Sequence, residues 1–386
     1  MDYTANWNYP TNVHVGRGRI AELPDLCRSL GMQAPLLITD PGLAAVPMVQ
    51  KAVDDIQGTG LRCGMFSKIK ANPTEDNVTA GVDYYRQHAH DGVIAFGGGS
   101  ALDAAKAVAL MIGQHRPIWD FEDVGDNWTR VDAAAMAPVV AVPTTAGTGS
   151  EVGRASVITD QLQHTKKIIF HPNMLPKQVI LDPELTVGLP KGMTAATGMD
   201  ALSHSLEALC SPFYHPMAAG IAAEGIRLVQ EYLPRAVADG TDIAARTQML
   251  VCSSMGATAF QKGLGAMHAL AHPLGALYDA HHGTLNAILM PYVLQANKSA
   301  IEQKISWLAR YMGLADASFT GFLNWVLSLR EMLAIPHSLA AINIDESRRK
   351  TVARMAVADP SAGGNPISFS QEQYSDIFVA AVHGTL

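Results

Sequence analysis

Residues 92–112 read GVIAFGGGSALDAAKAVALMI and join an apolar run, a glycine triplet and a helical stretch. The run 92–96 is continuously apolar, which is typical of a strand buried on both faces of a parallel sheet. A glycine loop between a strand and a helix lets backbone amides approach a phosphate, and the helix N-terminus favours negative charge. A tight turn without a ligand is the alternative. The loop is not the Rossmann fingerprint, because Leu102 stands where the third glycine would be.

The composition and the spacing of apolar residues change near residue 187. Before this point, apolar runs alternate with helical stretches, which predicts an α/β domain with a mostly parallel sheet. These runs cover residues 35–39, 92–96, 139–142 and 179–181. After it, Ala, Leu, Met and Glu recur with helical spacing and no convincing strand follows. Helices are expected over residues 195–209, 221–233, 244–260 and 305–314. The expected domains are therefore an α/β domain, residues 1–187, and an all-helical domain, residues 188–386.

Composition excludes several classes of protein. A net charge of −7 argues against a nucleic-acid binder, which normally carries a basic face. No apolar run reaches the roughly 18–20 residues of a membrane span. The opening MDYTANWNYP lacks the basic and apolar regions of a secretory signal. The four cysteines are widely spaced without a CxxC pair, which fits a reducing compartment. We expect a cytoplasmic protein with neither a nucleic-acid nor a membrane partner.

Two further features support a dinucleotide site in the first half. The loop PTTAGTGSE, residues 143–151, follows a predicted strand, and its hydroxyls could bond a pyrophosphate and a ribose. A hydroxyl-rich surface loop is the alternative. Asp40 follows the run LLIT, where a carboxylate can bond an adenosine ribose and repel the 2′-phosphate of NADP. A turn former or a helix cap is the alternative for Asp40. Only together with the glycine loop do these features predict a dinucleotide, NAD rather than NADP.

The second half contains candidate metal ligands. Asp200 and His204 stand four residues apart in TGMDALSHSLEAL, so they project from one helix face at the edge of an apolar stripe. A divalent metal would satisfy a buried carboxylate and imidazole together. A solvated Asp–His pair is the alternative, and for these two residues alone it is favoured.

A histidine segment strengthens the metal interpretation. His268 and His272 are four residues apart, and His281 and His282 follow after a break marked by glycine and proline. Their neighbours are small and apolar, where histidines without partners are uncommon. Nitrogen ligands with one carboxylate suit Fe(II), Zn(II), Ni(II) or Co(II) rather than Ca(II) or Mg(II). Spacing leaves open which histidines bind, although at most one of His281 and His282 is expected to do so.

The sequence closely resembles the iron-containing (group III) alcohol dehydrogenases, whose fold is shared with dehydroquinate synthase and glycerol dehydrogenase. The motifs that carry the resemblance span nearly the whole chain: YPTNVHVGRGRIAEL, GGGSALDAAKA, PTTAGTGSEV, KQVILDPELT, TGMDALSHSLEAL, the histidine segment and ADPSAGGNP. The resemblance implies an N-terminal α/β nucleotide-binding domain, a C-terminal all-helical metal-binding domain and an active site between them.

The resemblance also implies residue roles. The metal ligands fall on Asp200, His204, His268 and His282, and His272 matches a histidine that helps to move the proton. Asp40 matches the acid that selects NAD. The remaining cofactor-binding candidates are Gly97, Gly98, Gly99, Ser100, Asp103, Thr144, Thr145, Thr148 and Lys166, although Lys167 beside the last leaves that register open.

The implied activity is hydride transfer between NAD(H) and a small primary alcohol or aldehyde, including diols and hydroxy acids. Iron, Fe(II), is the first metal expected and Zn(II) the second, in a homodimer or larger homo-oligomer. A metal-dependent hydrolase or a lyase of the dehydroquinate synthase type are the alternatives. Lys262 would suit an anionic substrate if it lined the pocket, but a surface position is favoured because lysines are rarely buried.

Overall fold

The structure is a computed structural model that describes Tyr9, residues 11–163 and residues 165–386. The chain divides into two compact units, Tyr9–Gly188 and Leu189–Leu386. Among the described residues, no helix combines the length and the apolarity that crossing a membrane requires.

The N-terminal unit is built on a six-stranded parallel sheet in the order β1-β8-β5-β4-β2-β3. Its strands are β1 (Asn12–Val15), β2 (Pro35–Ile38), β3 (Gly64–Phe66), β4 (Gly92–Gly97), β5 (Val139–Pro143) and β8 (Gln178–Leu181). All four runs predicted as strands are present. The strands β1 and β3 at the two edges were not predicted, nor was an antiparallel hairpin of β6 (Ala155–Asp160) and β7 (Thr165–Phe170).

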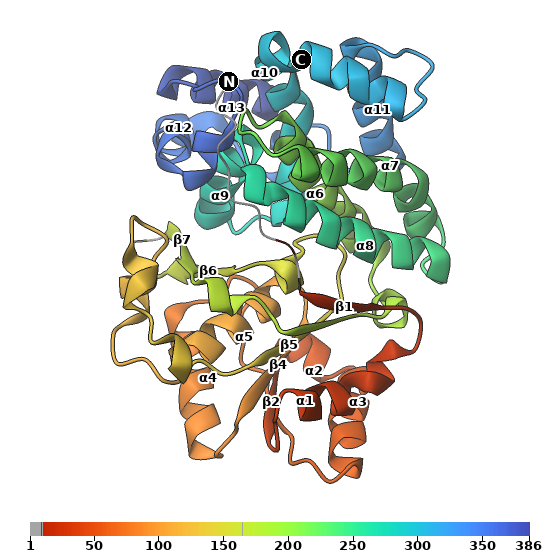
Figure 1. The fold of residues 1–386 in the computed structure, drawn as a ribbon. Coiled ribbons are helices and arrows are strands. Elements are labelled where there is room, and N and C mark those ends of the chain that lie inside the picture. Colours follow the sequence, from red (N-terminus) through yellow and green to blue (C-terminus); the bar gives the residue numbers. More distant parts are fainter. Residues whose placement is uncertain (1–8, 10, 164) are drawn as a thin grey trace. The chain divides into compact units, whose positions relative to one another are not determined.

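Helices cover both faces of this sheet, which explains its continuous apolarity. They are α1 (Leu23–Ser29), α2 (Pro41–Ala44), α3 (Pro47–Gly58), α4 (Glu75–Gln87) and α5 (Gly99–Met111). Figure 1 shows α1 and α3 on one side of β2, β4 and β5, with α4 and α5 on the other. Ile94 and Phe96 of β4 share a buried cluster with residues of α1 and α3. Because side chains alternate along a strand, Val93 and Ala95 face the α5 side.

The carboxyl ends of β2, β4 and β5 lie at one edge of the sheet, because these strands are parallel neighbours. Asp40 follows β2, the glycine triplet follows β4, and the threonine loop, residues 143–151, follows β5. The fold thus brings together three segments that are about 50 residues apart in sequence, at the edge where parallel α/β sheets place ligands.

Lys106, in the middle of α5, fastens the threonine loop to this edge. The side chain is 1% exposed, and its ammonium donates to the carbonyl oxygens of Ser150 at 2.9 Å, Gly153 at 3.4 Å and Ala155. Burial lowers the pKa of Lys106, and the nearby carboxylate of Asp103 opposes that effect. The lysine therefore satisfies main-chain acceptors of the loop that would otherwise be buried without a donor.

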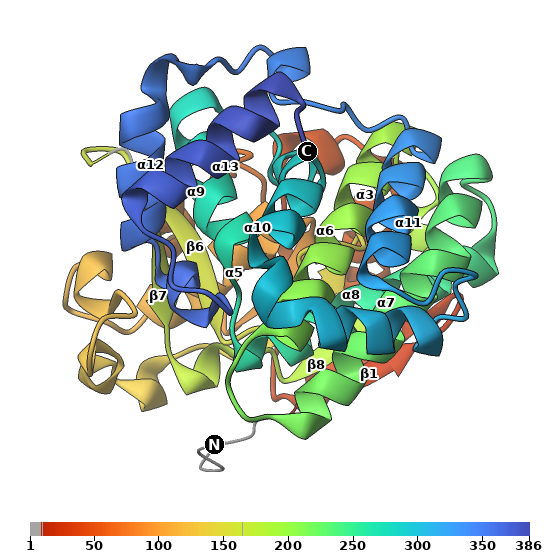
Figure 2. The same ribbon diagram turned by 90° about the horizontal axis from the view of Figure 1, so that it is seen from above.

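The C-terminal unit is helical, and its described residues contain no strand. Its α-helices are α6 (Lys191–Cys210), α7 (Pro216–Ala238), α8 (Ile243–Ala259), α9 (Ala266–Tyr278), α10 (His282–Tyr311), α11 (Phe319–Met332), α12 (Arg349–Ala358) and α13 (Gln371–His383). Figure 2 shows α10 running between α9 and α13 on one side and α6 and α11 on the other. Three predicted helices lie in α6, α7 and α8, with their ends shifted by a few residues. The fourth, predicted over residues 305–314, is only the last part of α10, which begins at His282.

The break expected in the histidine segment lies later than its proline suggests. Pro273 stands inside α9, which continues to Tyr278. The chain leaves the helix at Asp279, whose φ of 52° lies in the left-handed region. Aspartate tolerates this region better than most residues, so the turn needs no glycine there. α10 then begins at His282.

We predict that Lys106→Met destabilises the protein strongly. The variant leaves three main-chain oxygens without their donor, and each orphaned buried group costs about 1–3 kcal/mol. We therefore expect the free energy of unfolding in urea to fall by about 3 kcal/mol or more. Lys51→Met is the matched control, because Lys51 is 72% exposed and pairs with Asp55 on α3; its cost should stay below about 1 kcal/mol. Equal costs for the two variants would contradict the role given to Lys106.

Candidate functional site

Three predicted metal ligands meet inside the helical unit. α6 carries Asp200 and His204 one turn apart, and α9 brings His268 beside them. One potential ligand atom from each lies within 4.8 Å of those of the other two. The three residues are 2%, 4% and 1% exposed, so the solvated-pair alternative is excluded for Asp200 and His204. The helical spacing predicted from sequence therefore produces a buried donor cluster.

His282, the fourth predicted ligand, adjoins this cluster at the start of α10. Its Nε2 lies 3.6 Å from Asp200 Oδ1, and its ring centroid is 5.2 Å from that of His268. Asn286, one turn further along, places its amide nitrogen 2.9 Å from Asp200 Oδ1 and 3.2 Å from Nε2 of both His268 and His282. The acceptor atoms of three predicted ligands thus converge on one small volume.

This cluster fits a divalent cation such as Fe(II) or Zn(II). Burial lowers the pKa of His268, but the charge and hydrogen bond of Glu207, with the charges of Asp200 and Asp359, outweigh that effect and raise the pKa. The surroundings therefore favour a positive charge on this side chain, which a metal ion supplies as well as a proton does. The buried Oδ1 of Asn286 has no hydrogen-bond partner. Imidazole and carboxylate donors are those that Fe(II) and Zn(II) accept.

His272 differs from the ligand candidates in exposure and in contacts. Its side chain is 17% exposed, its Nδ1 lies 2.8 Å from Asp359 Oδ2, and its ring stacks on His282 with centroids 5.5 Å apart. Asp359 is nearly buried, which by itself raises its pKa, but His272 and the hydrogen bonds from Ser361 outweigh burial and lower it. The pair therefore holds one ring nitrogen fixed at the margin of the cluster.

The two adjacent histidines separate as expected from the spacing. His281 is the N-cap of α10, and its Nδ1 accepts the main-chain N–H of Thr284 at 3.4 Å. His281 is exposed, whereas His282 is partly buried. The helix start therefore turns His282 toward Asp200 and leaves His281 at the surface.

The expectation of a surface position for Lys262 is wrong. Lys262 is 6% exposed, and its ammonium donates to the carbonyl oxygen of Leu209 at 3.1 Å. Leu209 belongs to the last turn of α6, whose carbonyl oxygens have no partner within the helix. The lysine is buried because it caps this helix end. Phe260, two residues earlier, lies beside His204 with ring centroids 5.1 Å apart.

The loops after β4 and β5 form a cradle in which two of the three glycines have no room for a side chain. A Cβ on Gly99 would lie 2.5 Å from Cγ2 of Thr148, and one on Gly97 would lie 2.8 Å from Cβ of Ala101. A Cβ on Gly98 would make an ordinary contact, 3.4 Å from Cγ2 of Thr145. Gly97 also has a φ of 146°, which favours glycine over residues with a side chain. Thr144 N–H bonds the Gly97 carbonyl oxygen at 2.9 Å, which joins the two loops. Glycines in such contact expose main-chain amides at the start of α5, as a pyrophosphate requires.

Asp40 and Ser100 also make hydrogen bonds inside the protein. Asp40 is the N-cap of α2, and its Oδ1 accepts the N–H of Leu43 at 3.0 Å. Asp40 therefore does cap a helix, which was the alternative considered for it. Its other oxygen, Oδ2, lies beside the cradle, 3.7 Å from the position that a Cβ on Gly97 would take. Ser100 Oγ donates to the carbonyl oxygen of Ala71.

Two further cofactor candidates have structural contacts. Asp103 accepts hydrogen bonds from Ser150 Oγ and from Val157 N–H at 3.0 Å, so it braces the threonine loop together with Lys106. Lys167 pairs with Asp160 at 3.0 Å and lies 5.0 Å from the ring centroid of Trp119. Lys166 is its neighbour on β7 and points to the opposite face of the hairpin. Lys167 is thus committed to the hairpin, which favours Lys166 as the cofactor candidate.

Family models match both units. The model of iron-containing alcohol dehydrogenase matches residues 10–183, and that of the C-terminal part of the Fe-containing alcohol dehydrogenase family matches residues 194–382. The chain belongs to the iron-containing alcohol dehydrogenase family. Membership confirms the resemblance seen in the motifs, the predicted fold class and the predicted class of enzyme, a metal-dependent oxidoreductase.

Individual relatives in this family are similar over almost their whole length. A 4-hydroxybutyrate dehydrogenase of Cupriavidus necator is 38% identical over 376 residues, which cover 95% of this chain and 97% of that protein. The crystal structure of a 1,3-propanediol oxidoreductase has a TM-score of 0.92 at 32% identity, covering 98% of this chain and 100% of that one. A sulfoacetaldehyde reductase of Bifidobacterium kashiwanohense, in complex with NAD+, has a TM-score of 0.88 at 28% identity, covering 98% and 99%.

The comparisons bear on the cofactors and on the rival functions. The expected iron and NAD agree with the family and with the NAD+ complex of the sulfoacetaldehyde reductase. None of these three relatives is named as a hydrolase or a lyase, so neither alternative is favoured. The roles of individual residues stay predictions.

Three residues at the cluster were missed by the sequence analysis: Glu207, Asn286 and Asp359. Helical spacing could have found two of them, since Glu207 lies three residues after His204 and Asn286 four residues after His282. Asp359 stands in the motif ADPSAGGNP, which was identified without a role. Its contact with His272 spans 87 positions, and no local pattern reveals it.

We predict a pH-dependent contribution of Lys262 to stability. Burial, with the charge of Lys304, lowers the pKa of Lys262 from 10.5 to about 8. Between these values the unfolded chain binds more protons at this residue, so its contribution to stability rises with pH. Wild type should therefore become more stable relative to Lys262→Met as the pH rises from 7.5 to 10. The difference in the free energy of unfolding, measured in urea, should change by about 1 kcal/mol or more. Raised pKa values of Cys27, Cys63 and Cys252 make stability fall as pH rises, and the comparison cancels them because they are the same in both proteins. Cys210 interacts with the charge of Lys262, so its titration belongs to the measured difference. A constant difference would contradict the prediction.

Proposed function

We propose that this protein oxidises small primary alcohols, or reduces the aldehydes, with NAD(H) and a divalent metal held by Asp200, His204, His268 and His282. The observation that carries the proposal is the buried donor cluster: the first three ligand candidates come within 4.8 Å of one another in the helical unit of an iron-containing alcohol dehydrogenase. A buried carboxylate among imidazoles requires a cation or donors to offset its desolvation.

The α/β unit is proposed to bind the dinucleotide. The amides of Gly97, Gly98 and Gly99 would receive the pyrophosphate, with hydroxyls of the threonine loop beside them. The carboxylate of Asp40 would accept hydrogen bonds from the adenosine ribose and repel a 2′-phosphate, which favours NAD over NADP. In this division of labour, residues 1–187 form the nucleotide domain and residues 188–386 the metal and substrate domain.

Asp200, His204, His268 and His282 would hold a metal that supplies Lewis acidity, and the α/β unit would hold a nicotinamide that supplies hydride chemistry. The protein has to hold and orient these groups and to move a proton. His272 suits the proton, because Asp359 fixes its Nδ1 while the partly exposed ring leaves Nε2 for exchange with solvent.

The name of one relative supports a choice of substrate class to test first. The protein of Cupriavidus necator acts on 4-hydroxybutyrate, a primary alcohol with a terminal carboxylate. We therefore propose ω-hydroxy acids and their semialdehydes as the first substrates to test, ahead of diols and simple alcohols. A cytoplasmic location and a homodimer or larger homo-oligomer complete the proposal, and the mass of the protein in solution tests the latter.

The function is tested by NADH oxidation with a panel of aldehydes on protein reconstituted with Fe(II). We expect turnover with at least one short ω-carboxy aldehyde and a preference for NADH over NADPH of about tenfold or more, which corresponds to about 1.4 kcal/mol. Apo-protein treated with a chelator is the control and should be inactive. Equal or better use of NADPH would overturn the role given to Asp40, and absence of NADH binding would overturn the proposed function.

The two histidines of α9 should separate in a mutational test. His268→Ala removes a buried ligand candidate, so we expect it to lose the metal as measured by elemental analysis after gel filtration. His272→Ala should retain the metal while kcat falls by roughly 10²–10⁴-fold, the usual contribution of a general acid–base group. Equal metal loss in both variants would sink this division of roles.

A further inference from the structure

Glu207 is a buried acid for which the predicted ligand set has no role. It is 5% exposed and lies on α6, seven residues after Asp200 and three after His204. Spacings of seven and three residues place all three side chains on one face of the helix. The helix that supplies two ligand candidates therefore also presents a second carboxylate toward α9.

The carboxylate of Glu207 holds α9 at two points. Its Oε2 lies 2.6 Å from His268 Nδ1, and its Oε1 accepts the main-chain N–H of Met267 at 2.7 Å. Met267 is in the first turn of α9, where main-chain N–H groups have no partner within the helix and negative charge is favoured. Glu207 thus fixes both the start of α9 and the His268 ring.

These contacts select one tautomer of His268. An ionised carboxylate only accepts, so Nδ1 must carry the proton that it shares with Glu207. On the other side of the ring, the amide nitrogen of Asn286 lies 3.2 Å from Nε2 and can only donate. In the neutral form of His268, which is the form that can bind a metal, both neighbours therefore leave the lone pair on Nε2, which faces the ligand cluster.

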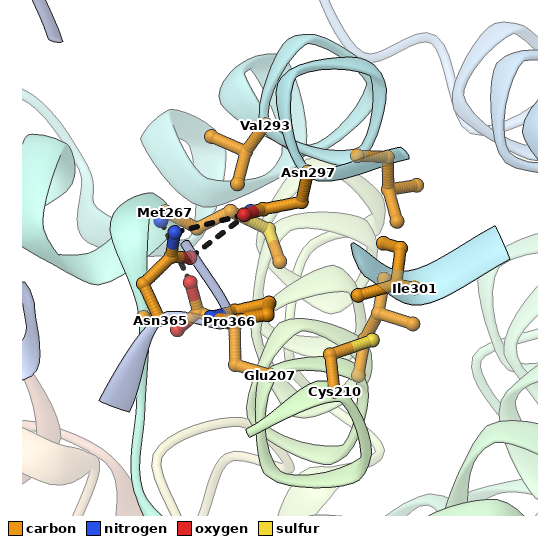
Figure 3. Close-up of a pocket in the computed structure, with 11 residues that line it drawn as sticks. Glu207, Cys210, Met267, Val293, Asn297, Ile301, Asn365 and Pro366 are labelled. Atoms are coloured by element: carbon orange, nitrogen blue, oxygen red, sulfur yellow. Dashed lines mark hydrogen bonds between the residues drawn. The ribbon is translucent and has the colours of Figure 1, made fainter. Parts of the chain in front are cut away.

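No lysine or arginine lines the small cavity beside Glu207, so none of the lining residues is a cationic partner for this carboxylate. The cavity has a volume of about 20 Å³ and is lined by Glu207, Cys210, Val293, Ile301 and other residues. Figure 3 shows Asn297 and Asn365 turned toward one another beside Glu207, joined by hydrogen bonds of 2.9 and 3.0 Å. A cavity of this size holds about one water molecule, so it is no substrate pocket. Its polar residues Glu207 and Asn365 instead accept main-chain N–H groups at the start of α9.

The neighbouring contact at the same helix end offers a control. Asn365 Oδ1 accepts the N–H of Ala266 at 3.1 Å, so it caps α9 as Glu207 does, but no hydrogen bond joins it to the histidine. Gly265 is the N-cap of α9, and a Cβ there would lie 2.9 Å from Asn365 Oδ1 and 3.0 Å from Glu207 Oε1. The two side chains therefore share one packed environment and differ in their contact with His268.

We propose that Glu207 is a positioning residue of the metal centre, which sets metal affinity by holding Nδ1–H of His268 so that Nε2 faces the ligand cluster. The proposal rests on the proposed function, in which Asp200, His204, His268 and His282 bind the metal. Carboxylate partners of metal-bound histidines commonly act in this way, and their loss lowers metal affinity by about 10–100-fold.

The test compares Glu207→Gln and Asn365→Ala with wild type as full-length apo-protein titrated with Co(II). Glutamine keeps the volume but has one acceptor oxygen for two donors, so its amide group opposes either His268 or Met267. We expect the Co(II) dissociation constant of Glu207→Gln to rise by about 10–100-fold, with an altered visible d–d spectrum. Asn365→Ala should stay within about threefold of wild type, with an unchanged spectrum, because the hydrogen bonds that it loses, to Ala266, Asn297 and Ile367, do not include His268.

Three outcomes separate the possibilities. Glu207→Gln that binds Co(II) like wild type, or an equal loss of affinity in both variants, overturns the positioning role. If Glu207→Gln does not fold without metal, Glu207→Asp is measured instead; it keeps the charge but is too short to reach both donors, and wild-type affinity would again overturn the proposal. Wild type that binds no Co(II), Zn(II) or Fe(II) overturns the proposed metal function itself.

Discussion

The buried carboxylate of Asp200 sets the constraint around which the helical unit is organised. A charge taken out of water must be matched by donors or by a cation, because its desolvation otherwise costs several kcal/mol. Three helices place such groups around Asp200: His204 lies on α6, His268 on α9, and His282 and Asn286 on α10. Each helix delivers its groups one turn apart, so the contacts among these three helices determine both the packing and the composition of the cluster.

In the α/β unit, the loops proposed to bind the dinucleotide have to present main-chain amides in a fixed shape. Parallel strands bring the loops after β2, β4 and β5 to one edge, and glycines let two of them approach within contact distance. Such loops have few partners of their own, so the rigidity must come from elsewhere. Lys106 and Asp103, both on α5, supply it by bonding carbonyl oxygens, a hydroxyl and an amide of the segment that follows β5. The loop proposed to bind the phosphates is thereby held by an ion pair of a buried lysine and a partly buried aspartate.

Local patterns predicted much of this arrangement, and long-range contacts explain the rest. Continuous apolar runs found the central strands, and four-residue spacing found Asp200 with His204 and His268 with His272, because both follow from the geometry of one element. The edge strand β3 has only three residues, and β1 is exposed at both ends. Neither therefore shows the continuous apolarity that revealed β2 and β8, although these are no longer than β1. The partnership of His272 with Asp359 depends on how α9 packs, which no single window contains. Lys262 was misjudged because a lysine is usually exposed; it is buried here since the last turn of α6 lacks donors.

His268 and His272 show how one hydrogen-bond pattern can serve two tasks. They stand one turn apart on α9, and each has its Nδ1 bonded to a carboxylate, Glu207 for the first and Asp359 for the second. The tautomer is therefore the same for both, with the lone pair on Nε2. What differs is access, because the side chain of His268 is 1% exposed and that of His272 is 17% exposed. A buried Nε2 facing a carboxylate is suited to a resident cation, whereas a ring at the margin can exchange a proton with water. The depth of the ring within the helical unit, rather than its first hydrogen bond, thus distinguishes the proposed ligand from the proposed proton carrier.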